Sequence, residues 1–136
     1  MNISQYPNAD QIAALLGSQE TGPVVMVNLL KFKDRADAPD AGLSGKEAYA
    51  KYADAMVGLV QQNGGRLIWS GRLTGMVIGA SDVPFDMVAL IEYRSRQAFA
   101  ALVQDARVQA IGVHRAAGLE GQWLIAASQE GVPQPT

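Results

Sequence analysis

One apolar stretch near the start of this 136-residue chain limits the folds open to it. Residues 23–33 read Pro-Val-Val-Met-Val-Asn-Leu-Leu-Lys-Phe-Lys, and a short apolar run rich in β-branched residues predicts a buried strand. Because side chains alternate along a strand, one face should carry the even-numbered residues from Met26 to Phe32, including Asn28. A buried amide needs hydrogen-bond partners, so Asn28 either ties down neighbouring backbone or points into a ligand pocket.

Composition excludes several classes of protein. The formal net charge is −2 and no basic cluster stands out, so we expect no nucleic-acid and no membrane partner. Apolar runs fall short of the ~20 residues that cross a bilayer, and the first seven residues lack the features of a signal peptide. Without cysteine there is no disulfide and no thiolate site. We therefore expect one soluble, cytoplasmic domain over residues 1–136.

Capping boxes mark where two helices begin. Asn8 with Gln11 predicts a short leading helix over residues 8–17, and Ser44 with Glu47 opens a second helix that ends at residues 63–65, Asn-Gly-Gly. A polar loop over residues 34–45 precedes the second helix, and loops of this length are often functional or mobile.

The second half of the chain holds three more strand signals and two shorter helices. Residues 66–79 alternate, with Leu67, Trp69 and Leu73 expected on one face and a bend or bulge at Gly71 and Gly75. A turn over residues 81–84 and a strand over 86–93 follow. Ser95 caps one helix, and Asp105 caps a second helix that runs through Ile111. The chain ends with a strand over 122–127 and a loose tail over 129–136.

After the leading helix the order is β-α-β-β-α-β, the α+β ferredoxin-like arrangement of an antiparallel sheet with both helices on one face. The strands carry apolar residues in both orientations, so the second face of the sheet should be buried as well. Two copies that pair across a two-fold axis would bury it, giving a homodimeric α/β barrel in which Trp69 and Trp123 are core or interface anchors.

Several short motifs, in this order and spacing, resemble domain-of-unknown-function family 1330 of the dimeric α/β-barrel superfamily. They are residues 27–32, Tyr49 and Tyr52, Gly64-Gly65, residues 91–95 and Arg115. The resemblance covers about residues 22–128, which we take as the core of the domain. It implies a fold and not a reaction, because the superfamily includes cofactor-free monooxygenases, haem-degrading enzymes, isomerases and dehalogenating enzymes.

Polar residues set among apolar ones are the candidate ligand-binding groups. Asn28 can orient a carbonyl or carboxylate in a cleft between sheet and helices, or hydrogen-bond backbone only. Tyr49 and Tyr52 share a helix face, where their rings pack in the core and their hydroxyls can reach the pocket mouth.

The charged candidates lie on or near the later elements. Arg115 can bind a carboxylate in a bidentate manner, and Glu92 is its expected partner, either as a structural pair or to hold Arg115 over a substrate. Arg72 is a second possible anion contact. His114 is the only histidine; it can act as a base, as a haem ligand or as a helix cap, and it has no acidic neighbour in sequence to orient it.

The sequence predicts a protein that binds a small, partly apolar, anionic molecule. If it is an enzyme, Tyr52 and Arg115 are the expected catalytic residues, holding an oxyanion without a cofactor, while Asn28 orients it. Asn28, Tyr49, Arg72, Glu92 and His114 are the expected ligand-binding residues, and no spacing suggests a metal site. The alternatives are a non-catalytic binding or interaction protein and, third, a haem-binding or monooxygenase-like protein.

Overall fold

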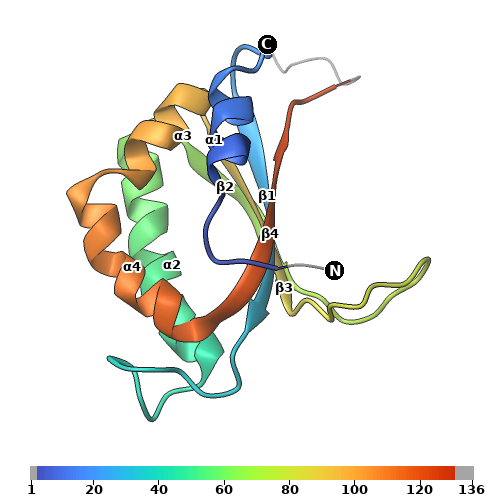
Figure 1. Ribbon diagram of the computed structural model, residues 1–136, viewed down its shortest axis with the longest axis vertical. Helices are drawn as coiled ribbons and strands as arrows, with labels where there is room; N and C mark the ends of the chain where they lie inside the picture. Colours follow the sequence, from blue (N-terminus) through green and yellow to red (C-terminus); the bar gives the residue numbers. More distant parts are fainter. Residues whose placement is uncertain (1–2, 131–136) are drawn as a thin grey trace.

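A computed structural model describes residues 3–130 as a four-stranded antiparallel sheet with helices on one face (Figure 1). The strand order is β2-β3-β1-β4, which confirms the ferredoxin-like fold and the leading helix. In chain order the elements are α1 (Ala9–Leu16), β1 (Val24–Phe32), α2 (Gly45–Gln62), β2 (Arg66–Arg72), β3 (Met87–Tyr93), α3 (Arg96–Val103), α4 (Ala106–Gly118) and β4 (Leu119–Ala127).

Both predicted capping boxes are present. In each one the N-cap side chain accepts the N3 amide while the N3 side chain accepts the N-cap amide, at Asn8 with Gln11 and at Ser44 with Glu47. Helix α2 ends at Asn63, and Gly64 follows with φ of 82°, a conformation that favours glycine. The start and the end of α2 are therefore local properties of the sequence.

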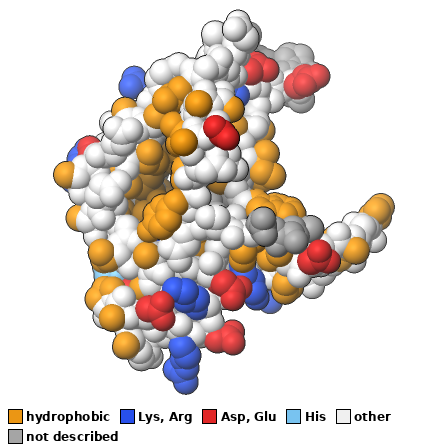
Figure 2. All heavy atoms as spheres, in the orientation of Figure 1, with side chains coloured by type: hydrophobic (Ala, Val, Ile, Leu, Met, Phe, Trp, Pro, Cys, Tyr) orange, Lys and Arg blue, Asp and Glu red, His pale blue; other side chains and the backbone are white. Residues whose placement is uncertain are grey.

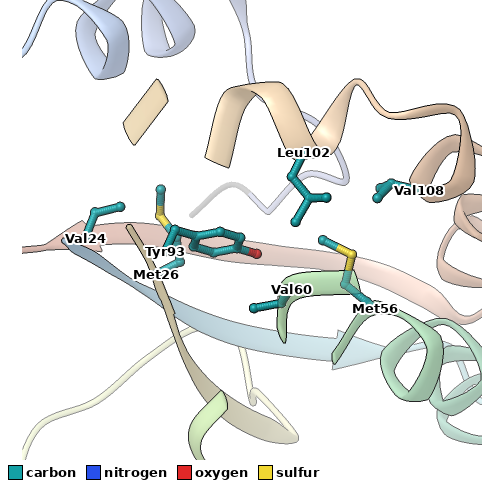
Figure 3. Close-up of a cluster of buried hydrophobic side chains, with 7 residues drawn as sticks. All are labelled: Val24, Met26, Met56, Val60, Tyr93, Leu102 and Val108. Carbon is teal, nitrogen blue, oxygen red and sulfur yellow. The ribbon is translucent and has the colours of Figure 1, made fainter. Parts of the chain in front are cut away.

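The core lies between the sheet and the helices. Figure 3 shows its main cluster, in which side chains from β1 and β3 meet side chains from α2, α3 and α4. Its members are Val24, Met26, Met56, Val60, Tyr93, Leu102 and Val108. The register places even-numbered residues of β1 on this face, as the alternation predicted, and Met26 and Leu30 are almost fully buried.

Strand β2 differs from the prediction. It ends at Arg72, and its register with β3 shifts between Leu67 and Trp69, so the bulge lies at Ile68 and not at the glycines. Leu67 pairs with Ile91 and Trp69 with the next residue, Leu90, so Leu67 and Trp69 face opposite sides of the sheet. The expectation that they share one face is wrong, because an unpaired residue at a bulge reverses the alternation.

The boundaries of two other elements differ from the prediction. Helix α4 runs to Gly118, well past Ile111, and β4 begins directly at Leu119. Gly118 has no Cβ, which lets the end of α4 lie against the backbone of Gly45. The predicted loose tail lies mostly outside the described residues.

The second face of the sheet carries no helix in the described chain (Figure 1). We call it the open face; its apolar members are Val25, Val27, Leu29, Trp69, Val88, Leu90, Trp123, Ile125 and Ala127. Residues 73–86 form an arm that projects on this side, with Phe85 packed on the Trp123 ring at its base. Figure 2 shows the concave surface between arm and sheet, with apolar atoms at the arm's tip.

Candidate functional site

A cleft of about 1460 Å³ lies between the helices and the sheet. Most of its wall is apolar, with Met26 and Leu30 from β1, Ile91 from β3 and Phe99 from α3. The cationic side chains at its wall are Lys46, Arg96 and Arg115, against one carboxylate, Asp54, among the described residues. An apolar cleft with an excess of positive charge suits an anionic ligand with an apolar body.

Arg115 lies in the last turn of α4, where a cation interacts favourably with the helix dipole. Its Nη2 donates hydrogen bonds to the carbonyl oxygen of Gln5 and to Oε1 of Gln122, the latter at 3.0 Å. The guanidinium also lies over the Tyr6 ring, 5.3 Å from its centroid. All of these partners are neutral, so within residues 3–130 the charge of Arg115 is oriented but not neutralised.

Asn28 lines the cleft and also hydrogen-bonds backbone. Its Nδ2 donates to the carbonyl oxygens of Met26 and Ala89, each at 3.2 Å, and its Oδ1 accepts from Nε2 of Gln122 at 3.5 Å. Gln122 therefore joins Asn28 to Arg115 in one side-chain network. The sequence offers the same signal for Gln122 as for Asn28, because each is a polar residue in an apolar strand.

Four tyrosines line the cleft, and three of them lie in α2 and β3: Tyr49, Tyr52 and Tyr93. Burial raises the pKa of all three, and neighbouring tyrosines raise it further for Tyr49 and Tyr93, while Arg115 opposes the rise for Tyr49 and Tyr52. The hydroxyls are therefore protonated at neutral pH. Tyr52 can donate a hydrogen bond to a ligand oxygen, but the raised pKa makes it a poor general base.

Two predicted site residues lie away from the cleft. Glu92 pairs with Val25 in the sheet and therefore points to the open face, where Arg66 Nε binds its carboxylate at 3.1 Å. The expected pairing of Glu92 with Arg115 is wrong, because the two residues lie on opposite sides of the sheet. Arg72 is exposed beside Lys31 and Asp86 in a separate shallow depression at the end of β2.

His114 also lies outside the cleft wall. Its Nδ1 is 2.7 Å from Oδ2 of Asp40, and Nζ of Lys51 is 2.8 Å from Oδ1 of the same carboxylate. Asp40 is almost fully buried and belongs to the loop between β1 and α2. His114 thus has the acidic partner that its sequence neighbours lack. Sequence reasoning missed Asp40, because it lies 74 residues away in a loop with no periodic pattern.

We expect this cluster to contribute to the acid sensitivity of the protein. Hydrogen bonds from Lys51 and His114 lower the pKa of Asp40 below its usual value. A carboxyl with a lowered folded-state pKa stabilises the fold above its unfolded pKa of about 3.9, and that contribution disappears as the pH falls further. Asp40→Asn should therefore be less stable at neutral pH and should lose less stability below about pH 4.

Urea unfolding between neutral and acidic pH measures this contribution. Asp37→Asn is the control, since Asp37 is an exposed residue paired with Lys33 and an exposed ion pair contributes little. Identical pH profiles for Asp40→Asn and the wild type would rule out the role of Asp40.

Neither a metal-binding cluster nor a membrane-spanning helix is found in the part of the chain that the structure covers. No cluster of three or more histidine, aspartate or glutamate side chains is placed to hold a metal ion within residues 3–130. None of the helices there combines the length and the apolar character needed to span a membrane.

Known structures resemble this chain over nearly its whole length. The RPA0582 protein of Rhodopseudomonas palustris, of unknown function, is 30% identical, with 96% of this chain and 100% of that chain covered and a TM-score of 0.86. Its methylated form matches with 30% identity, coverage of 98% and 100%, and a TM-score of 0.85.

A more distant structure shares the fold alone. A dabb family protein with a ferredoxin-like fold from Mesorhizobium loti is 10% identical, with 82% of this chain and 100% of that chain covered and a TM-score of 0.50. No family model and no curated protein matches the sequence. The 30% identity to the Rhodopseudomonas protein, with 96% of this chain and 100% of that chain covered, shows that this chain, with its ferredoxin-like fold, belongs to the family of RPA0582.

Proposed function

We propose that the protein binds a small, partly apolar anion in the cleft between its sheet and its helices. The observation that supports this most directly is Arg115, a cation held in place by neutral partners and without a carboxylate among the described residues. Arg115 is partly buried, and a partly desolvated guanidinium without a counterion would be stabilised by an anionic ligand. The cleft supplies apolar surface for the rest of the molecule.

Each polar group has a role in this proposal. Arg115 binds the anionic oxygen, the Tyr52 hydroxyl donates a second hydrogen bond, and Asn28 with Gln122 fixes the orientation of the guanidinium. Tyr49 packs against Tyr52, with ring centroids 5.5 Å apart, and supports its position. The same donors can stabilise an oxyanion that develops during a reaction, so cofactor-independent catalysis is the chemistry this site could support.

We also propose that the chain is a homodimeric member of domain-of-unknown-function family 1330. The motifs at residues 27–32 and 91–95 support the family, and the apolar open face supports the dimer. A cytoplasmic location and a single domain over residues 1–136 are part of this proposal; the lack of cysteine is compatible with a reducing compartment.

Binding of dodecanoate, an anion with an apolar chain, tests the proposed site. We expect isothermal titration calorimetry to detect dodecanoate binding that weakens about tenfold or more in Arg115→Gln, the scale of one hydrogen bond to a charged group. Tyr52→Phe, which removes only the hydroxyl, should weaken binding by a smaller factor. Arg72→Gln is the control, because Arg72 is an exposed cation away from the cleft.

Unchanged affinity in both Arg115→Gln and Tyr52→Phe would contradict the proposed site. Native mass spectrometry of protein purified gently from its own cells would complement the titration, since a retained extra mass identifies the class of the natural ligand.

A further inference from the structure

A second arginine at the cleft has an unsatisfied donor. Arg96 is the first residue of α3 and only 7% of its surface is exposed. Its Nη2 donates a 3.4 Å hydrogen bond to Oγ of Ser128. Its Nη1 is buried and has no hydrogen-bond partner, and no carboxylate of residues 3–130 forms an ion pair with Arg96. Sequence analysis gave no role to this residue.

The surroundings of Arg96 make an unpaired guanidinium group unfavourable. It contributes to the cleft wall near Tyr93 and Phe99, whose rings pack edge to face in the apolar core. Buried guanidinium groups are normally paired, because desolvating the charge costs several kcal/mol that only an opposite charge and hydrogen bonds offset. The single hydroxyl group of Ser128 offsets little of this desolvation cost. The Arg96 guanidinium therefore needs a further hydrogen-bond acceptor.

The two arginines belong to opposite ends of the cleft. Arg96 follows Tyr93, which pairs with Val24 at the start of β1. Arg115 binds Gln122, which pairs with Leu30 near the end of β1. Val24 and Leu30 are six residues apart, which is roughly 20 Å along a strand. The strand face between them carries Met26 and Asn28, and the cleft there is lined largely by apolar side chains.

We propose that Arg96 is a second anion-binding group of this cleft and that the ligand is an elongated molecule with an acidic group at each end of an apolar body. A long-chain α,ω-dicarboxylate has this chemistry. One carboxylate binds Arg115, the chain lies against the apolar wall, and the other carboxylate accepts a hydrogen bond from Nη1 of Arg96. This inference rests on the proposed function, because it extends the site at Arg115.

Comparing dodecanedioate with dodecanoate by calorimetry tests whether Arg96 is a second anion-binding group. The two probes share a chain length and differ by one carboxylate. We expect the wild type to bind the diacid about tenfold or more tightly than the monoacid. A length series from octanedioate to hexadecanedioate should show an optimum, since both ends must reach their arginines. In Arg96→Gln the advantage of the diacid should disappear while dodecanoate binding is retained.

The outcomes separate this inference from the proposed function. If dodecanoate binds through Arg115 but the diacid has no advantage at any length, Arg96 is not an anion site and the proposed function stands. If Arg96→Gln keeps the full diacid advantage, the second carboxylate lies elsewhere and the inference is wrong. If neither probe binds the wild type, both proposals fail.

Thermal unfolding of the ligand-free protein gives a readout that does not depend on the probes. Arg96→Met removes a buried, unpaired charge and keeps an apolar stem, so we expect Tm to rise by about 3 °C or more. A residue retained only for the fold would give the opposite result. A fall in Tm in Arg96→Met, together with an unchanged diacid preference, would overturn the proposal.

Discussion

Replacing Gly45 with alanine is expected to lower the free energy of unfolding by about 3 kcal/mol, because the added methyl group has no space. A Cβ at Gly45 would overlap the carbonyl oxygen of Lys33 and the carbonyl oxygen of Gly118. Both obstacles are backbone atoms, which cannot move aside as a flexible side chain can. Gly45 also donates its amide hydrogen to the Lys33 carbonyl at 3.1 Å, so a shift of the helix would weaken that hydrogen bond.

Gly58 offers a matched control within the same helix. A Cβ at Gly58 meets nothing within 4 Å, so Gly58→Ala should stabilise the protein by roughly 0.7 kcal/mol through helix propensity. Urea unfolding of the two variants at neutral pH measures the difference. Equal stability of Gly45→Ala and the wild type would show that the contact between the start of α2 and the end of α4 is looser than described.

The second large effect concerns the open face. Ile125→Glu is expected to convert a dimer into a monomer, weakening association at least about a hundredfold, from the ~3 kcal/mol cost of burying an unpaired charge. Ile125 pairs with Val27 and is half exposed in the single chain. In a two-fold interface the same patch serves both copies, so each substitution acts twice. Sedimentation across a concentration series measures the association.

Leu16→Glu is the control for this substitution. Leu16 is 44% exposed, close to the 49% of Ile125, but it lies on α1 and not on the open face. The control should remain dimeric and folded. A monomeric wild type, or an Ile125→Glu variant that associates like the wild type, would contradict the proposed interface and leave the open face for another partner.

The arm over residues 73–86 bears on the same interface. At its tip Val77 and Ile78 are almost fully exposed, while at its base the Asp86 carboxylate accepts the Phe32 amide at 2.8 Å. An exposed apolar tip on an anchored arm is costly for an isolated chain. Under the dimer proposal the tip is the part of the arm with the most apolar surface to bury.

Local signals explain how much of the fold could be predicted. Capping residues and hydrophobic periodicity act within a few positions, so the strand around Asn28 and the start and end of α2 follow from the sequence. The order of strands and helices then limits the topology to few possibilities, and the ferredoxin-like sheet is one of them. Asn28 was predicted as a site residue because it is polar in an apolar strand, and Arg115 because it fits the family resemblance and can bind a carboxylate.

Register and burial depend on atoms far apart in the sequence. The bulge at Ile68 follows from pairing with β3, so the sequence could not show that Trp69 turns to the open face. Arg94 and Arg96 look alike in the sequence, yet only packing between α3 and the end of β4 buries Arg96 beside Ser128. Local sequence patterns are enough to predict the elements and their order. Which charges lack partners depends on tertiary packing, because desolvation depends on the whole surrounding fold.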